Sequence, residues 1–130
     1  MEYQTKLFQK RKLDKSQDPL KLLYDGLIEI YQQEHLSYNL PQTPIDHSVG
    51  ARGCQEVWMT HSSTGETIQI GMHQFVGATD TLVHPCVPMM RATFRINDGE
   101  VELEWSLCKS TVLTNKILSM VEDVFKMIRL

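Results

Sequence analysis

Asn97, Asp98 and Gly99 stand between two runs of alternating apolar and polar residues, and this pattern constrains the fold more than any other part of the sequence. Asp-Gly is favoured in tight hairpin turns because these residues tolerate the positive φ angles that the turn requires. The runs on either side are "MMRATFRI" and "EVELEWSLC". The pattern therefore predicts an antiparallel hairpin whose second strand points its glutamates to solvent. The residues of that strand expected to face a core are Val101, Leu103, Trp105 and Leu107.

A second hairpin is predicted upstream of the first. The segments "QEVWMTH" and "ETIQIGMHQF" both alternate apolar with polar residues, and the stretch from Ser62 to Gly65 joins them. Alternation with a period of two is typical of strands that bury one face. The two hairpins together predict a sheet of about four strands.

Helices are expected on both sides of these hairpins. Asp18 followed by Pro19 is typical of a helix start, because aspartate caps free amides and proline gives up no needed donor. Apolar residues then recur at helical spacing to about Glu34. The segment after Ser110, which we expect to be the N-cap, carries a second apolar stripe. This stripe consists of Leu113, Ile117, Met120, Val121, Val124 and Ile128.

The sequence thus predicts an α+β fold: an antiparallel sheet of about four strands, with an N-terminal helix and a C-terminal helix packed on one face. At 130 residues, the chain has the length of one domain. We expect residues 18–130 to form that domain and residues 1–17 to be a polar N-terminal segment. The basic cluster in this segment, from Lys6 to Lys15, is interpreted as solvated rather than as a binding arm.

Composition narrows the classes of function. The net charge of −3 argues against general nucleic-acid binding, which needs a basic surface. Three cysteines without regular spacing favour free thiols in a reducing compartment, so a cytoplasmic location is expected. No apolar run reaches the ~20 residues that a membrane span requires.

The segment "HPC" contains the candidate nucleophile, Cys86. Pro85 favours an extended conformation at His84, so the imidazole and the thiol would lie on one side of the chain. A nearby imidazole favours the reactive thiolate form of cysteine. The alternative interpretation is that Cys86 is a small buried residue at the start of a core strand.

Two further segments contain candidate anion ligands. Arg52 lies between two glycines in "GARG", where a guanidinium can approach a phosphate closely; the alternative is a surface turn. Lys109 lies in "CKST" just before the last helix, whose first amides attract anions. The alternative there is a capped helix with a solvent-exposed lysine.

No metal site is expected. The possible ligands His61, His73, His84 and Cys86 show none of the spacings typical of zinc sites. The sequence also contains no P-loop, dinucleotide-binding turn or GxSxG elbow. No cofactor is therefore assigned with certainty.

Taken together, these segments resemble the thymidylate synthase and deoxynucleotide hydroxymethylase superfamily. "ARGCQEV" is similar to the arginine loop that leads into a strand in that family. "HPCVPMMRATFRINDGEVELEWSLCKS" is similar to its Pro-Cys nucleophile, strand, Asp-Gly turn, second strand and Arg-Ser pair. "TNKILSMVEDVFKM" resembles the asparagine-led helix that follows.

The resemblance implies a role for each matching residue. Cys86 matches the thiol that adds to a pyrimidine ring, which is a form of covalent catalysis. Arg52 and Ser110 match phosphate ligands, and Lys109 replaces an arginine. Asn115 matches the base-reading asparagine if several residues before it are deleted.

Several parts of the family pattern are absent. No counterpart of the catalytic glutamate is found, and "TGETIQIG" stands in the place of the paired arginines. Val112 replaces the aspartate after the Arg-Ser pair, and the closing His-x-Tyr strand has no match. We therefore expect a small thymidylate-synthase-like domain, a homodimer, that binds a pyrimidine nucleoside monophosphate without full folate-dependent catalysis. If it is an enzyme, the resemblance implies a one-carbon transferase.

An alternative from another class is a non-enzymatic protein–protein interaction module, such as an adaptor or inhibitor. The seven methionines, Met89 and Met90 among them, favour this alternative because methionine adapts to varied binding partners.

Overall fold

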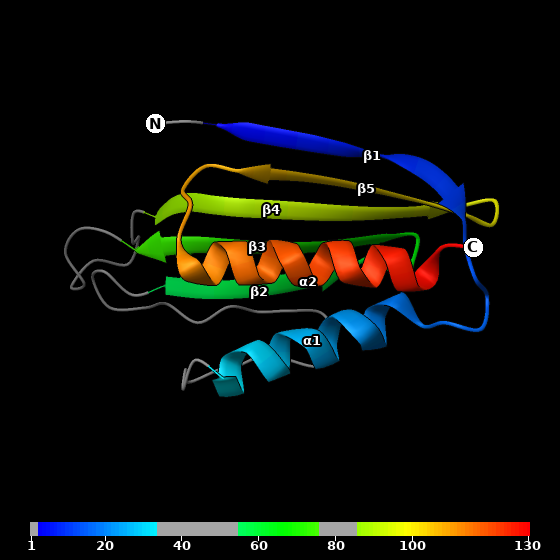
Figure 1. Cartoon of the computed structure of the whole chain (residues 1–130), viewed down its shortest axis with the longest axis horizontal. Helices are drawn as coiled ribbons and strands as arrows, with labels where there is room; N and C mark the ends of the chain where they lie inside the picture. The colour runs from blue at the N-terminus through cyan, green and yellow to red at the C-terminus, as the bar shows by residue number, and fades with distance from the viewer. Residues whose placement is uncertain (1–2, 34–54, 76–85) are drawn as a thin grey trace.

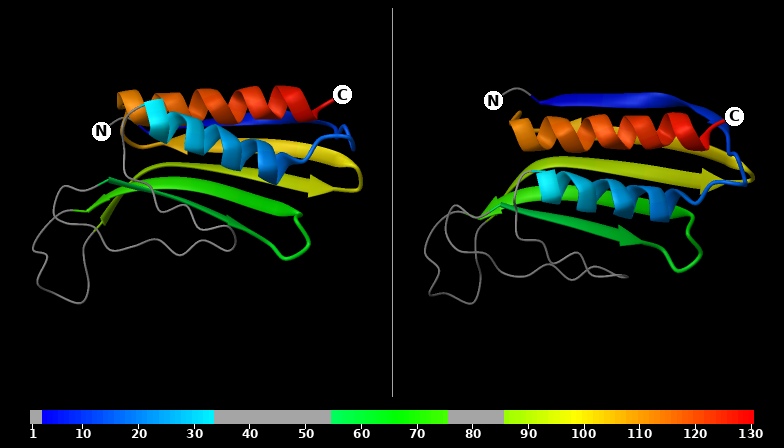
Figure 2. Two further views of the ribbon diagram at one scale, coloured as in Figure 1. Left: turned by 90° about the horizontal axis from the view of Figure 1, so that it is seen from below. Right: turned by 60° about the horizontal axis from the view of Figure 1, so that its bottom comes forward.

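The computed structural model describes residues 3–33, 55–75 and 86–130, which form one sheet covered by two helices (Figure 1). The strand order is β1-β5-β4-β3-β2, and all neighbours are antiparallel. Both helices lie on the same face of the sheet (Figure 2). The elements are β1 (Gln4–Lys12), α1 (Pro19–Gln33), β2 (Gln55–His61), β3 (Thr67–Phe75), β4 (Cys86–Asn97), β5 (Glu100–Leu107) and α2 (Val112–Ile128).

The predicted α+β architecture is confirmed, with one strand more than the two hairpins supply. This strand, β1, comes from the segment expected to be a polar extension of the domain. It pairs with β5, so that Phe8 lies opposite Leu103 and Lys6 lies opposite Trp105. Alternation did not indicate β1 because it is an edge strand in which most residues are exposed.

Both predicted hairpins are present. In the β4–β5 turn, Asp98 and Gly99 have φ angles of 53° and 74°, as an Asp-Gly hairpin requires. In the β2–β3 turn, Gly65 has a φ angle of 76°. The hairpin registers place Ile70 opposite Met59 and Phe94 opposite Leu103. Apolar residues of four strands therefore face the helices together.

The core lies between this face of the sheet and the two helices. Its fully buried side chains include Leu23 and Leu27 from α1 and Ile117 and Ile128 from α2. Trp105 is half-buried on the same side, where its indole Nε1 donates a hydrogen bond to Glu122 at 3.0 Å. The other face of the sheet, which we call the open face, is not covered by either helix (Figure 2).

The two helix starts differ in how well the sequence predicted them. Helix α1 begins at Pro19 as expected, and the Asp18 carboxylate accepts a hydrogen bond from the Lys21 amide at 3.3 Å. For α2, the predicted cap Ser110 is wrong, because the N-cap is Thr111. Its hydroxyl accepts from the Thr114 amide at 3.1 Å, and the Thr114 hydroxyl accepts from the Thr111 amide at 2.7 Å. This reciprocal pair is a capping box, which a serine one residue earlier cannot form in this geometry.

In the part of the chain that the structure describes, neither helix is long and apolar enough to cross a membrane.

Candidate functional site

The candidate nucleophile, Cys86, is the first residue of β4 and pairs with Phe75 at the end of β3. The structure describes the backbone of Cys86 but not the placement of its side chain. The next pair in the ladder joins Val87 to Gln74. Lys109 reaches this same end of the sheet, where its ammonium donates a hydrogen bond to the side-chain oxygen of Gln74 at 3.0 Å.

Two other predicted ligands, Ser110 and Asn115, lie at the start of α2 and contact each other. The Asn115 amide donates a hydrogen bond to the Ser110 hydroxyl at 2.9 Å, and both residues are exposed. The capping box already uses the Thr114 amide. An anion at this helix start would therefore compete with the side chain that caps it.

Arg52 and His84 lie outside the described residues. Their roles as an anion ligand and as a partner of Cys86 remain predictions. Among the predicted site residues that the structure describes, Lys109 lies at the same end of the sheet as Cys86. Ser110 and Asn115 lie together at the adjoining helix start.

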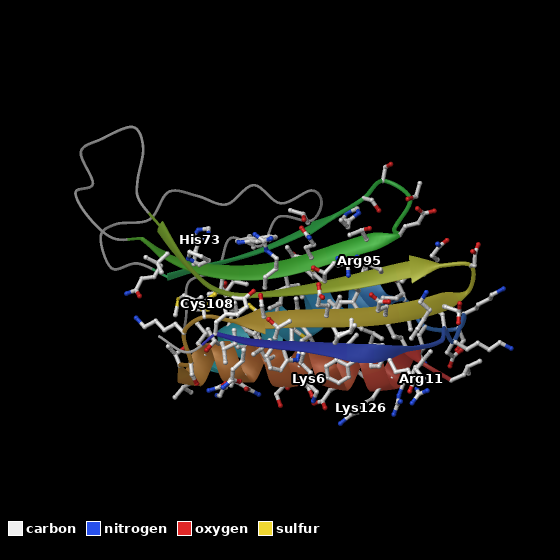
Figure 3. The ribbon with its side chains drawn as sticks, turned by 90° about the horizontal axis from the view of Figure 1, so that it is seen from above. Lys6, Arg11, His73, Arg95, Cys108 and Lys126 are labelled. Carbon is white, nitrogen blue, oxygen red and sulfur yellow. The ribbon has the colours of Figure 1, made fainter. Side chains whose placement is uncertain are left out.

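The open face contains a hollow at this same end of the sheet, with a volume of about 420 Å³, which we call the open-face hollow. Its walls are formed by Tyr3, which precedes β1, and by residues in or next to β2, β3, β4 and β5. Figure 3 shows two of its residues, His73 and Cys108, at one end of the sheet. The lining residues are Tyr3, Trp58, Met72, His73, Pro88, Met90, Arg91, Ser106 and Cys108.

The floor of the hollow depends on Gly71, which lies opposite Trp58 in the β2–β3 ladder. A Cβ atom at position 71 would overlap the indole ring of Trp58. The ring therefore lies against the β3 backbone, which only glycine permits at this position. The Arg91 guanidinium lies over the same ring, 5.9 Å from its centroid, within the range of a cation–π contact.

A β-bulge at Met89 shapes the neighbouring wall. Met72 pairs with Met90 but His73 pairs with Pro88, so β4 contains one extra residue between them. The Met89 carbonyl accepts hydrogen bonds from the Cys108 amide at 2.8 Å and the Lys109 amide at 3.1 Å. The bulge thereby fixes the chain after β5, where Cys108 enters the hollow.

The hollow brings together side chains with useful chemistry. His73 is only 8% exposed, whereas Arg91 is exposed, and Cys108 is a half-buried free thiol. An indole, a guanidinium, an imidazole and a hydroxyl from Ser106 suit a flat ligand with an anionic group. The sequence motifs did not predict this combination, although the glycine inside β3 and the tryptophan at a solvent-facing strand position were visible signs of it.

Several other polar side chains of the open face pair with one another. Arg95 lies 3.6 Å from a Glu102 carboxylate oxygen and 3.8 Å from one of Glu104. Gln69 donates a hydrogen bond to Thr93 at 3.4 Å. Such partly exposed ion pairs contribute little to stability. They do, however, hold the Arg95 guanidinium beside Glu102 and Glu104. Arg91 is therefore better placed than Arg95 to bind a ligand.

Asp14 and Lys21 have shifted pKa values, and both lie outside the hollow. Hydrogen bonds from the Ser16 hydroxyl and amide hold the pKa of Asp14 below its ordinary value. A hydrogen bond and charge attraction from Asp25 raise the pKa of Lys21. These shifts reflect local turn and helix contacts, and neither group belongs to the candidate site.

Of the histidines considered as metal ligands, the described pair His61 and His73 lie at opposite ends of one hairpin. His61 pairs with Ile68 at one end of the β2–β3 hairpin, whereas His73 pairs with Glu56 at the other. Among the described residues, no three histidine, cysteine, aspartate or glutamate side chains gather in a way that could hold a metal ion.

Comparison of the chain with protein-family models, with curated proteins and with solved structures found no match. The proposals below therefore depend on the geometry of this chain and on the motifs of its sequence.

Proposed function

We propose that this domain binds a small planar anion, of the pyrimidine nucleoside monophosphate class, in the open-face hollow, without full folate-dependent catalysis. The observation that carries the proposal is the indole of Trp58, held flat on β3 with the Arg91 guanidinium over it. The indole supports the exposed guanidinium, whose outer face can stack on a base while its fork matches a phosphate. The volume of about 420 Å³ lies in the range of small-molecule sites.

The position of the hollow supports a thymidylate-synthase-like interpretation of the ligand. Lys109 bonds to Gln74 beside the strand pair that contains Cys86, and the next residue back, Cys108, lines the hollow. A cation and two cysteine positions thus lie at one end of the sheet. If the domain retains one-carbon transfer, Cys86 is the proposed nucleophile, and the thiol of Cys108 is a second candidate.

Titration with deoxyuridine and deoxycytidine monophosphates, followed by NMR of the Trp58 indole, tests this proposal. We expect binding below millimolar concentration, weakened about tenfold by Arg91→Gln because a charge-assisted phosphate contact is lost. Arg95→Gln is the matched control, since it removes an arginine from the same face whose partners are Glu102 and Glu104. Arg52→Ala tests the predicted second anion ligand.

Cys86→Ser and Cys108→Ser distinguish the two thiols. Loss of any covalent adduct with a 5-halogenated pyrimidine nucleotide in one variant alone, detected by mass spectrometry, assigns the nucleophile. No binding of either monophosphate at millimolar concentration would refute the ligand proposal.

A protein–protein interaction module, an adaptor or inhibitor, is the second candidate function. It is favoured by two exposed apolar side chains, Leu7 on the edge strand β1 and Tyr3 just before this strand. Exposed apolar groups on a strand edge suit pairing with another chain. The expected homodimer would also be a contact with another chain, and sedimentation equilibrium measures whether it forms.

A further inference from the structure

The outer edge of β1 is available for one more strand. β1 is the first strand in the sheet order, so none of the described strands covers this edge. Its pairing with β5 is regular from Gln4 to Phe8, and a bulge follows before Arg11. Backbone groups that alternate with those bonded to β5 point to the outer edge, where they can pair with an added strand.

The side of this edge next to the helices is basic. Lys6 and Arg11 lie opposite Trp105 and Val101, residues of β5 that face the helices. Lys126 from α2 lies along the same border, as Figure 3 shows for these three cations. Arg129 joins them, with its guanidinium 5.9 Å from the Phe125 ring centroid. Glu122 offsets one of these charges through its 3.7 Å contact with Lys6.

The opposite side of the same edge carries two exposed apolar side chains near the start of β1. Leu7 alternates with Lys6 and lies opposite Glu104, so it is on the open face. It is 62% exposed, and Tyr3 is 66% exposed. An added strand would therefore meet cations on one side and exposed apolar side chains on the other.

We propose that the outer edge of β1 binds an extended segment of another protein in which acidic and apolar residues alternate. Side chains of a strand alternate between faces, so one set of positions would place carboxylates beside Lys6, Arg11 and Lys126. The other set would cover Leu7 and Tyr3. This surface shares Tyr3 with the lining of the open-face hollow, but the proposal does not depend on nucleotide binding there.

On the inner edge of β1, its partner β5 places the apolar residues Trp105 and Val101 opposite Lys6 and Arg11, so β5 supplies no carboxylate directly opposite these two cations. A second copy of β1 is a poor occupant, because antiparallel self-pairing would place cations of the two copies close together. Lysines on edge strands oppose such self-association. Charge complementarity therefore selects an acidic partner.

The test uses the full chain and a fluorescein-labelled peptide, Glu-Leu-Glu-Val-Glu-Leu-Glu, with binding followed by fluorescence anisotropy. The control peptide has lysine in place of each glutamate and should not bind. Two further peptides carry N-methyl groups on alternate amides, one set in each peptide. Because only one set of amides faces β1, we expect one methylated peptide to bind about tenfold more weakly and the other to bind like the parent.

Substitutions on the protein locate the surface. Leu7→Thr and Lys126→Gln should each weaken binding about threefold, since each removes one exposed contact. Lys21→Gln is the matched control: it also removes one exposed helix cation, but Lys21 lies on α1 and pairs with Asp25. Its affinity for the peptide should be unchanged.

Three outcomes would overturn the proposal. Equal binding of both methylated peptides would mean that charge alone attracts the peptide. Equally tight binding of an oligothymidylate would mean that the edge is a general polyanion site. A dimer, detected by sedimentation equilibrium and lost in Leu7→Thr, would mean that a second copy occupies the edge.

Discussion

Gly71 shows how one residue can determine the shape of a binding surface. Its lack of a side chain lets the Trp58 indole lie against the middle of β3, and the ring in turn supports Arg91. A glycine inside a strand ordinarily weakens it, so its presence there calls for a close approach by another group. The sequence contained this sign, but it did not reveal which group approached.

We predict that Gly71→Ala displaces the Trp58 ring and lowers the free energy of unfolding by about 1–3 kcal/mol, the usual cost of overpacking. Fluorescence reports the displacement when Trp105, the other tryptophan of the chain, is replaced by phenylalanine. The emission of Trp58 should shift to longer wavelength as the ring becomes more exposed.

A double-mutant cycle is the control for this prediction. In a Trp58→Ala background, the added methyl group meets no ring, so Gly71→Ala should cost much less stability. An equal cost in both backgrounds would show that the backbone of β3, rather than the indole, requires glycine.

At the scale of elements, the start of α2 shows that capping preference alone does not locate the N-cap of a helix. Ser110 and Thr111 are both good capping residues, so sequence preference alone did not identify the cap. The decision comes from the capping box with Thr114, a buried residue whose hydroxyl also donates to the Lys109 carbonyl at 3.1 Å. Ser110 is left to contact Asn115 on the surface.

We predict that Thr111→Ala lowers the free energy of unfolding by about 1 kcal/mol, the typical value of an N-cap. Thr111→Ser, which keeps the hydroxyl, should stay close to the wild type. Urea denaturation followed by circular dichroism measures both changes.

Ser110→Ala is the matched control, and it should change stability by less than about 0.5 kcal/mol because its hydroxyl caps nothing. If Ser110→Ala is as costly as Thr111→Ala, the cap assignment is incorrect.

At the scale of the whole molecule, the elements with local patterns were predictable and those that depend on distant contacts were not. Asp98 with Gly99 marked one hairpin, and Asp18 with Pro19 marked the start of α1, because turn and cap preferences act over a few residues. β1 has only Phe8 as a partly buried large apolar residue, so its place in the sheet depends on β5, far along the chain.

The candidate site follows the same rule. Trp58, Arg91 and Cys108 come from three separate strand regions, and only the strand registers bring them to one hollow. The motifs "GARG" and "HPC" suggested a site from neighbouring residues alone. Arg52 and His84 in those motifs lie outside the described residues, so their part of the prediction stays a prediction.

The position of β1 leads to a prediction about the whole fold. Removing residues 1–13 would uncover β5 and the Phe125 ring, whose centroid lies 5.4 Å from that of Phe8. We expect the free energy of unfolding to fall by more than about 3 kcal/mol, the lower range for losing a buried aromatic residue. Urea denaturation measures the change.

Removing only residues 1–3 is the control and should have little effect, because β1 begins at Gln4. If the longer deletion is equally harmless, residues 1–17 are a dispensable extension and β1 contributes nothing to the stability of the domain.

The bulge at Met89 has a consequence for how relatives of this chain would be recognised. Met89 is the extra residue of β4 between the Met72–Met90 and His73–Pro88 pairs. It allows Pro88 to face the hollow although Met90, two residues later, faces the helices. A homologue without Met89 could keep the same hairpin and helices, with Pro88 still opposite His73, yet it would lose the Met89 carbonyl that holds the Cys108 and Lys109 amides beside the hollow. Chain length across this stretch, more than residue identity, would then distinguish homologues that share the pocket from those that share only the scaffold.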